Sequence, residues 1–346
     1  MSTPPAPRTL LPGVLVGHDT HAHGPTGVTV LLLPEGTTAG VDVRGAAPGT
    51  RETDLLDPVN TIEHVDALVL AGGSAYGLAA ADGVAQWLEA QGRGVAVGAA
   101  RVPIVPAAVI FDLAVGDPSV RPDLASGARA CAAAVWIGDA GQGNVGAGAG
   151  ASVGKLLGQA CAMRGGVGIA SISAHGLTMA AVVVVNAVGD VVDPATSAVL
   201  AGARSAPDSL VTVGAVDALL GRSAQPTAPG ATGPEPGGST TIGALITDAR
   251  LSKAQVTRLA QVGHDGLART IRPVHTPMDG DTLFAAATGA VPAAHQELIA
   301  PDLLSVVLSM MAAEVTAQAV LAAARNARGL RIDTGWLPAA ADLVRG

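Results

Sequence analysis

Short apolar runs, each bounded by glycine or proline, constrain the fold of this chain more than any other feature. Gly27–Leu33 (GVTVLLL) and Ala67–Gly72 (ALVLAG) are rich in β-branched or aliphatic residues and contain no charge. This pattern predicts strands that are buried within a sheet. The runs at 166–174 (GVGIASISA) and 177–193 (LTMAAVVVVNAVGDVVD) predict two further strands and are compatible with a hairpin.

Alanine-rich segments with helical spacing separate these runs. Ser74–Gly92 and Ser252–Thr270 have apolar residues three and four positions apart, and each begins with a serine suited to cap a helix. Leu303–Ala324 is the longest hydrophobic segment and contains Glu314 and Gln318. Because a charge at the centre of a bilayer is costly, we interpret this segment as a core helix rather than a membrane span.

The composition excludes several classes of protein. With 49% apolar and 14% charged residues, the chain has enough apolar surface to fold, and with 2% aromatic residues its core must consist of small aliphatic side chains. The net charge is −8 and no lysine–arginine cluster occurs, which argues against a nucleic-acid partner. Only Cys131 and Cys161 are present, and the first residues lack the pattern of a signal peptide. We therefore expect a reduced, cytoplasmic protein.

One segment differs from the rest in composition. Residues 222–238 (RSAQPTAPGATGPEPGG) are rich in proline and glycine and predict a flexible linker. A strand-like run, STTIGALITDA, follows at once. The segment is either an ordinary linker or one that presents a scissile peptide bond just before a hydroxyl residue.

GQGNVG at Gly141–Gly146 matches the glycine pattern of a dinucleotide-binding loop, so a nucleotide-binding α/β protein is the alternative function. That mechanism also needs a carboxylate about 20 residues later, and none occurs between Asp139 and Asp190. A closely packed loop is the simpler interpretation.

The segment GAGASVGKLLG does not match the phosphate-loop pattern, because Leu156 follows Lys155 where a serine or threonine is required. Lys155 is either a surface lysine or a cation near reacting groups.

Two further groups of residues have both a structural and a functional interpretation. His18, His21 and His23 form either a metal cluster or a solvated turn, and no acidic or cysteine partner lies at a suitable spacing. Asp279 and Asp281 flank a glycine before a predicted strand, where they either shape a turn or orient an amine.

Ser74 follows a predicted strand and precedes a predicted helix, as does the nucleophile of an α/β-hydrolase. The G-x-S-x-G pattern fails because Tyr76 replaces its second glycine. A helix cap at Ser74 is the favoured interpretation.

Eight blocks occur in the order typical of the DmpA-type peptidase family, and from about Gly13 to Gly289 the chain resembles that family. They are GPTGVTVLLLPEG, AGVDVRGAAPGTRETDLLDP, VLAGGSAYGL, VIFDL, GAGASVGK, VVVVNAVGD, STTIGALITDA and HTPMDGDTLFA. The family contains L-aminopeptidase/D-esterases, β-peptidyl aminopeptidases and nylon-oligomer (6-aminohexanoate-oligomer) hydrolases.

The resemblance implies an α+β fold, a four-layer αββα sandwich like that of N-terminal-nucleophile hydrolases but with DmpA-type strand connectivity. It also implies one catalytic domain spanning residues 1–346 that cleaves itself between Ser239 and Thr240. The products are an α chain of residues 1–239 and a β chain of residues 240–346. Family members assemble such αβ units into tetramers or larger oligomers, and they use neither a metal nor a cofactor.

The same resemblance assigns roles to individual residues. Thr240 is the nucleophile, and its freed α-amine, with a reference pKa near 8, is the base. Lys155 lies near the threonine oxygen, and Asn186 donates to the oxyanion. Asp279 and Asp281 orient the nucleophile and its amine, and a final set lines the substrate cleft: Ser74, Tyr76 and Phe111.

The sequence departs from the family pattern at two positions. Ser239 precedes the cleaved bond where the nylon-oligomer hydrolases have asparagine, so Ser239 is a rival nucleophile if cleavage occurs after Gly238. Phe111 occupies a position where some relatives have tyrosine, so a phenol hydrogen bond is absent there. The expected substrate is a peptide with a free N-terminus or a linear 6-aminohexanoate oligomer.

Overall fold

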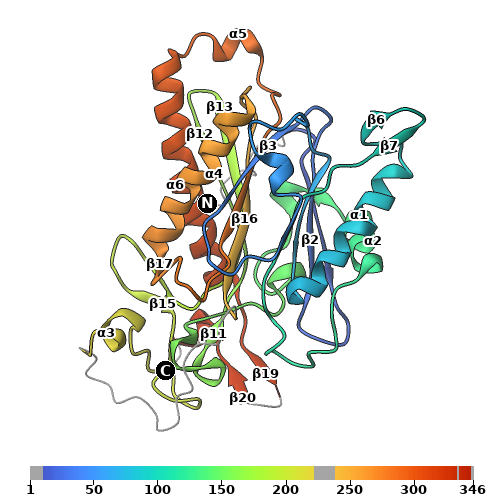
Figure 1. The fold of residues 1–346 in the computed structure, drawn as a ribbon. Helices are drawn as coiled ribbons and strands as arrows, with labels where there is room; N and C mark the ends of the chain where they lie inside the picture. The colour runs from blue at the N-terminus through green and yellow to red at the C-terminus, as the bar shows by residue number, and fades with distance from the viewer. Residues whose placement is uncertain (1–10, 222–237, 333–334, 344–346) are drawn as a thin grey trace, which may run out of the picture.

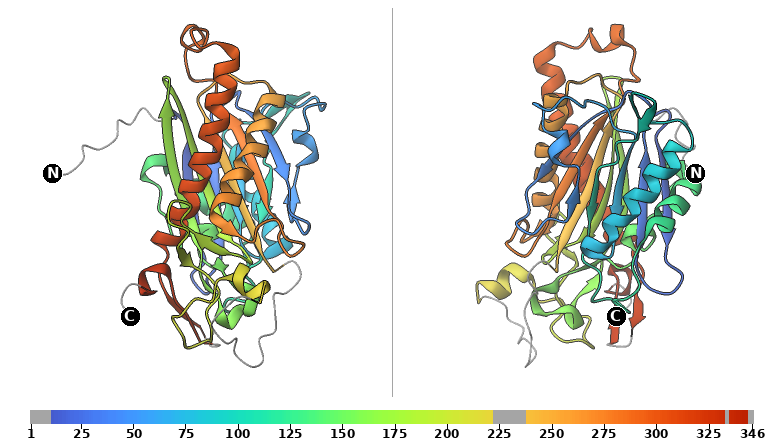
Figure 2. Two further views of the ribbon diagram at one scale, coloured as in Figure 1. Left: turned by 90° about the vertical axis from the view of Figure 1, so that its left-hand side faces the viewer. Right: turned by 45° about the vertical axis from the view of Figure 1, so that its right-hand side comes forward.

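Two β-sheets lie face to face at the centre of the molecule, and helices cover the outer face of each sheet (Figure 1). The computed structural model describes residues 11–221, 238–332 and 335–343. Figure 1 shows the four layers side by side in the order helices, sheet, sheet, helices, and the left view of Figure 2 looks onto the outer layer that contains α6. The predicted α+β, four-layer αββα architecture is therefore confirmed.

The first sheet has six strands and carries helices α1 (Ala80–Glu89) and α2 (Leu124–Ala132) on its outer face. Its strands, in spatial order, are β4 (Thr50–Arg51), β8 (Ala107–Val109), β5 (Ala67–Ala71), β2 (Gly27–Leu32), β1 (Leu15–Thr20) and β9 (Val135–Trp136). The strands predicted at Gly27–Leu33 and Ala67–Gly72 are thus β2 and β5, and every residue of both is buried.

The second sheet has five strands and carries helices α4 (Lys253–Thr270) and α6 (Pro301–Asn326) on its outer face. Its strands, in spatial order, are β12 (Gly166–Ala174), β13 (Leu177–Asn186), β16 (Thr240–Thr247), β18 (Thr282–Ala287) and β3 (Thr38–Val43). β12 and β13 form the antiparallel hairpin that their sequences suggested, and β16 pairs in parallel with β18.

Shorter elements surround the two sheets. They are β6 (Val95–Val97), β7 (Ala100–Val102), β10 (Ser152–Val153), β11 (Met163–Arg164), β14 (Asp190–Val192), β15 (Val199–Ala201), α3 (Ala215–Leu219), β17 (Ile271–Arg272), α5 (Ala293–Gln296), β19 (Leu330–Ile332), β20 (Gly335–Leu337) and α7 (Ala340–Leu343).

Alternation along the central strands divides the core into layers. On β13, Val182 and Val184 face the first sheet, whereas Val183 and Val185 face α4 and α6. Strands buried on both faces need no polar alternation, which explains the uninterrupted apolar runs in the sequence. By the same alternation Thr240 points between the sheets with Ile242, and this direction places the site described below.

Glycines and alanines bring the layers close together, as the shortage of aromatic residues predicts. A Cβ atom on Gly83 of α1 would lie 1.8 Å from the Leu124 carbonyl oxygen, and one on Gly127 of α2 would lie 2.0 Å from that of Ala80. Gly266 of α4 meets Ala313 of α6 in the same manner, at 2.3 Å. These helices pack backbone to backbone, so larger side chains at the glycines would separate them.

Helix α4 begins as predicted, with Ser252 as its N-cap. The Ser252 side chain accepts a hydrogen bond from the Gln255 amide, and the Gln255 side chain accepts one from the Ser252 amide, which completes a capping box. The prediction for Ser74 is wrong. Ser74 is the first residue of a 3₁₀ turn, Ser74–Ala79, its side chain caps nothing, and α1 begins only at Ala80.

Helix α6 contains the long hydrophobic segment. By length and composition this is the one described helix that could cross a membrane. Of its most apolar 18-residue stretch, 56% is buried inside the protein. Its buried side chains pack on β12, β13 and α4. The predicted linker at 222–238 lies outside the described residues, apart from Gly238.

Candidate active site

Thr240 is the first residue of β16, and it lies opposite Asn186, the last residue of β13. Both side chains are buried between the sheets, with Thr240 only 3% exposed. The Thr240 hydroxyl donates a hydrogen bond to the carbonyl oxygen of Ser239, at 2.5 Å. The Gly280 amide donates to the same oxygen at 3.0 Å. The carbonyl of the Ser239–Thr240 peptide bond therefore has two donors, one of them the adjacent hydroxyl.

Lys155 joins the preceding peptide bond, Gly238–Ser239, to the end of β13. Its buried ammonium group donates to the backbone oxygen of Asn186 (3.0 Å), the side-chain oxygen of Asn186 (2.8 Å) and the carbonyl oxygen of Gly238 (2.8 Å). Burial of a cation is tolerated here because three oxygens surround it. Lys155 thus holds the residue two positions before Thr240.

The side-chain amide of Asn186 is held at both ends. Its oxygen also accepts a hydrogen bond from the Ser152 amide at 3.0 Å, and its nitrogen donates to the carbonyl oxygen of Phe111 at 2.9 Å. Phe111 therefore contacts this part of the site through its backbone. The contact does not depend on whether the residue is phenylalanine or tyrosine.

Asp279 and Asp281 are both buried at the entrance to β18. Asp281 accepts the Thr241 amide on Oδ1 (2.6 Å), whereas Asp279 accepts the amide and the hydroxyl of Thr276 on Oδ2 (2.9 and 2.6 Å). Burial, followed by the charge of Asp281, raises the pKa of Asp279. Between the two aspartates, the Gly280 amide reaches Ser239, so this turn holds both sides of the expected scissile bond.

The residues predicted to line the substrate cleft occupy two neighbouring turns. The Ser74 amide donates to the carbonyl oxygen of Ile110 at 2.9 Å, beside Phe111. Tyr76 is 58% exposed, and the guanidinium of Arg121 lies 3.7 Å from the centre of its ring. Ser74 adopts a left-handed backbone conformation, with φ of 54°, which is uncommon outside glycine.

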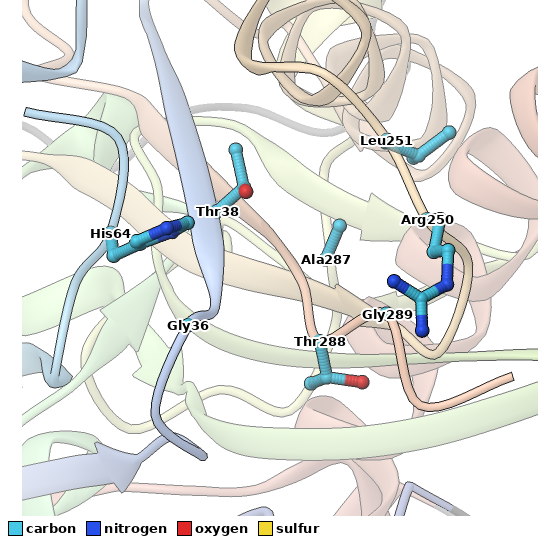
Figure 3. A pocket seen from close by; sticks show the side chains of 8 residues that line it. All are labelled: Gly36, Thr38, His64, Arg250, Leu251, Ala287, Thr288 and Gly289. Carbon is cyan, nitrogen blue, oxygen red and sulfur yellow. The ribbon is translucent and has the colours of Figure 1, made fainter.

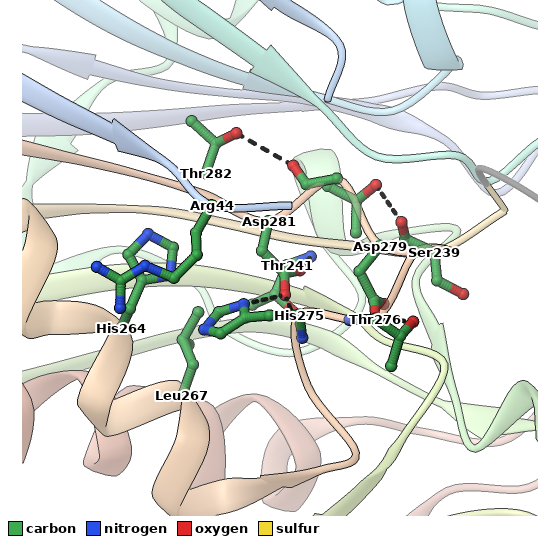
Figure 4. A network of polar contacts seen from close by, with 12 residues as sticks. Arg44, Ser239, Thr241, His264, Leu267, His275, Thr276, Asp279, Asp281 and Thr282 are labelled. Atoms are coloured by element: carbon green, nitrogen blue, oxygen red, sulfur yellow. Dashed lines mark hydrogen bonds and ion pairs between the residues drawn. The ribbon is translucent and has the colours of Figure 1, made fainter. Parts of the chain in front are cut away.

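Three further features around the site have no clear signal in the sequence. The donor at Gly280 is a backbone amide, which the residue type does not reveal. His275 contacts Asp281, and His264 from α4 lies against the His275 ring (Figure 4). Asp112 accepts the Gly73 amide at 2.7 Å, and burial raises its pKa to about 6. The blocks that contain His275 and Asp112 are visible in the sequence, but only the fold shows which groups they meet.

The glycine-rich loop at Gly141–Gly146 is a packed connection. A Cβ atom on Gly143 would lie 2.2 Å from the Asn326 carbonyl oxygen, and one on Gly146 would lie 2.5 Å from the Thr29 hydroxyl. A 3₁₀ turn, Gly146–Gly148, follows instead of the helix that a dinucleotide loop requires. The observed packing agrees with the closely packed interpretation.

The histidines near the N-terminus make separate contacts. His18 lies on β1 rather than in a loop, and its ring nitrogens contact the Thr29 hydroxyl (3.0 Å) and the Gly141 carbonyl oxygen (3.1 Å). The His21 ring nitrogen accepts the His23 amide. Within the described ranges no group of three or more His, Cys, Asp or Glu residues could hold a metal ion.

A pocket of about 360 Å³ lies at the opposite end of the second sheet (Figure 3). Its lining residues are Gly36, Thr38, His64, Arg250, Leu251, Ala287, Thr288 and Gly289. Ala287 pairs with Thr247, seven residues along β16 from Thr240, which corresponds to roughly 20 Å. This pocket is therefore separate from the Thr240 site.

Comparison with known proteins identifies the family. The sequence matches the model of the family described as Peptidase family S58 over residues 9–335. A protein of Mycobacterium tuberculosis named as an uncharacterized aminopeptidase is 50% identical over 317 residues, which cover 87% of this chain and 86% of the relative. A 6-aminohexanoate-oligomer endohydrolase of Paenarthrobacter ureafaciens is 36% identical over 282 residues, which cover 81% of this chain and 74% of that enzyme.

Solved structures agree with the fold. A β-aminopeptidase of a Burkholderia species superimposes with a TM-score of 0.68 at 23% identity, covering 100% of this chain and 95% of that one. The L-aminopeptidase D-Ala-esterase/amidase of Ochrobactrum anthropi, described as a variant of the Ntn-hydrolase fold, has a TM-score of 0.68 at 18% identity, covering 98% and 93%. The chain therefore belongs to peptidase family S58, the DmpA family, and is a hydrolase of amide or peptide bonds.

Proposed function

We propose that this protein is the precursor of an N-terminal-threonine amide hydrolase and that it cleaves its own Ser239–Thr240 bond. The observation that carries the proposal is the pair of contacts on the Ser239 carbonyl oxygen. The hydroxyl that would attack lies beside this carbonyl, and the Gly280 amide polarises it. Positioning of this kind is a large part of catalysis, because the reacting groups need no further ordering.

Self-cleavage would proceed through an ester. Thr240 Oγ1 attacks the carbonyl carbon of Ser239 and loses its proton, and the Gly280 amide stabilises the oxyanion that forms. The carbon–nitrogen bond then breaks, the Thr240 nitrogen takes up a proton, and Ser239 becomes esterified to Oγ1. Water hydrolyses this ester, which leaves a carboxylate on Ser239 and a free amine and hydroxyl on Thr240.

The free amine would then switch the enzyme on. Before cleavage the Thr240 nitrogen is an amide and has no basic lone pair, whereas an α-amine with a reference pKa near 8 accepts the hydroxyl proton at neutral pH. Thr240 Oγ1 attacks the substrate amide, the amine of the product leaves with a proton, and water hydrolyses the acyl-threonine ester. Lys155 and Asn186 stabilise the developing negative charge, since both lie at the β13 end opposite Thr240.

The substrate would be a peptide with a free N-terminus or a linear 6-aminohexanoate oligomer. Relatives named as aminopeptidases and as 6-aminohexanoate-oligomer endohydrolases support this class. Activity of processed enzyme should be measured on aminoacyl amides, β-peptides and aminohexanoate oligomers, with N-terminal and internal cleavage scored separately. Hydrolysis of none of them would contradict the proposed substrate class.

We also propose an assembly of αβ units into a tetramer or larger oligomer in the cytoplasm. Leu303, Val306 and Met310 form an exposed apolar row on α6, and contiguous exposed apolar surface is typical of protein–protein contacts. Cys131 and Cys161 are free thiols, which suits a reducing compartment. Light scattering of the processed protein tests the assembly, and a mass of one αβ unit would contradict it.

A pair of variants tests the cleavage. Thr240→Val removes the hydroxyl that faces the scissile bond, and Thr241→Val removes the next hydroxyl, which points to the other side of β16. On a denaturing gel we expect Thr240→Val to remain one full-length band, whereas Thr241→Val and the wild type give two bands. Mass spectrometry should place the new terminus at Thr240. A terminus at Ser239 would show that Ser239 is the nucleophile, and an intact, active wild-type chain would refute self-activation.

A further inference from the structure

His275 binds one oxygen of the Asp281 carboxylate with two donors. The ring nitrogen Nδ1 lies 2.7 Å from Asp281 Oδ2, and the backbone amide of His275 lies 3.2 Å from the same atom. Carboxylate oxygens accept hydrogen bonds, so we assign the hydrogen of this contact to Nδ1. The ring and the backbone of one residue thus fix the rotation of the Asp281 side chain.

The other oxygen of Asp281 connects this contact to the nucleophile. Oδ1 accepts the amide of Thr241, the residue after Thr240, at 2.6 Å. Gly280, the residue before Asp281, donates its amide to Ser239. Movement of Asp281 would therefore displace both the start of β16 and the donor on the scissile carbonyl.

The His275 ring packs against His264, which in turn contacts β3. The ring meets His264 of α4 in a T-shaped contact, with centroids 4.9 Å apart. Burial lowers the pKa of His264 to about 4, so this neighbour is neutral near pH 7. On β3, Asp42 accepts a bond from Arg44 at 2.6 Å, and the Asp42 backbone oxygen contacts His264 at 3.1 Å. His275 itself has φ of 53°, a left-handed conformation that glycine and asparagine tolerate best.

We propose that His275 is a positioning residue for the Thr240 nucleophile, acting through its Nδ1 hydrogen bond to Asp281. The proposal rests on the function proposed above, since it assigns His275 to the same reaction. His275 does not touch the reacting atoms. It fixes Asp281, which in turn holds the Thr241 amide and the turn that contains Gly280.

Three variants separate the donor from the backbone conformation. His275→Asn keeps a side-chain N–H close to the position of Nδ1 and tolerates the positive φ. His275→Gly tolerates the same φ but has no side-chain donor. His275→Gln has a donor one bond farther from the backbone, near the position of Nε2. The rate of self-cleavage, kcat and KM are measured for each variant together with its thermal unfolding temperature.

We expect His275→Asn to remain within about threefold of the wild type. His275→Gly and His275→Gln should lower the self-cleavage rate and kcat by roughly 10- to 100-fold with KM within about twofold, as expected for a displaced catalytic group. If His275→Gly does not fold, the comparison of His275→Asn with His275→Gln tests the proposal.

Wild-type rates in His275→Gly, or in His275→Gln, would overturn the proposal, as would equal losses in Asn and Gln. Failure of the proposed function gives a different result. In that case the wild-type chain stays intact or Thr240→Val remains active, whatever the His275 variants do.

Discussion

The backbone amide of Gly280 lies 3.0 Å from the carbonyl oxygen of Ser239, so a donor is in place on the peptide bond that we expect to break. Gly280 suits this position because a Cβ atom there would lie 2.4 Å from the Ala47 carbonyl oxygen and 3.0 Å from Thr240 Oγ1. A glycine between two aspartates therefore permits the close approach of the turn to the scissile bond.

Gly280→Ala should slow self-cleavage on the order of 100-fold, because the added methyl group pushes the donor away from Ser239. The measurement is the rate at which purified precursor converts to two bands. Gly141→Ala is the matched control, since its Cβ would make only ordinary contacts at 3.5 Å or more. Equal rates in the two variants would remove Gly280 from the mechanism.

Lys155 and Lys253 are the only lysines in the chain, and each is buried with three oxygen acceptors. Lys155→Met should abolish detectable self-cleavage because Gly238 and Asn186 lose their common donor. Lys253 donates to Leu55 and to the loop that follows it, away from the scissile bond. The Lys253→Met protein should therefore cleave itself normally, and its free energy of unfolding should fall by about 1–3 kcal/mol. Gels and thermal melts of both variants check this. Normal processing of Lys155→Met would contradict the assignment.

Burial raises the pKa of Asp112 from its ordinary value of 3.8 to about 6, so the folded protein binds this proton more tightly than the unfolded chain. Below pH 3.8 both states are protonated and the group costs nothing. Between pH 3.8 and 6 the unfolded chain ionises first, so the free energy of unfolding falls with rising pH, by roughly 3 kcal/mol at most.

Asp112→Asn removes this titration and keeps an acceptor for the Gly73 amide. We expect the free energy of unfolding of the variant minus that of the wild type to be larger at pH 7 than at pH 4, as measured by urea unfolding. The Asp112→Asn curve should retain a smaller slope with pH from Asp190, whose pKa burial also raises to about 6. The same stability difference at both pH values would contradict the raised pKa of Asp112.

Tyr76 presents an exposed ring beside the turn that holds Ser74, with Arg121 stacked on it. If this ring lines the cleft, Tyr76→Ala should raise KM about fivefold and leave kcat unchanged, since it removes binding shared by the ground state and the transition state. Tyr76→Phe keeps the ring and should match the wild type. Steady-state kinetics on one amide substrate suffice, and an unchanged KM in Tyr76→Ala would place the ring outside the cleft.

Local patterns predicted much of the fold. The capping serine of α4, the buried strands β2 and β5 and the β12–β13 hairpin all follow from neighbouring residues and from burial on both faces. Ser74 shows where such reasoning fails. Its position between a strand and a helix suggested a cap, but tertiary contacts impose a positive φ and a 3₁₀ turn there.

Residue type and spacing by themselves determined the aliphatic core with its close backbone contacts, because small residues can be buried only where backbones approach. The family and the candidate residues around Thr240 came from sequence blocks that resemble the DmpA-type peptidases. Only the tertiary structure decided that Lys155 reaches Gly238, that Gly280 donates to Ser239 and that His275 holds Asp281. The Gly280–Ser239 contact joins two backbone atoms and the Lys155 contact ends on a backbone oxygen, and all three contacts depend on strand register and turn geometry. Residue identities along the chain do not specify those distances.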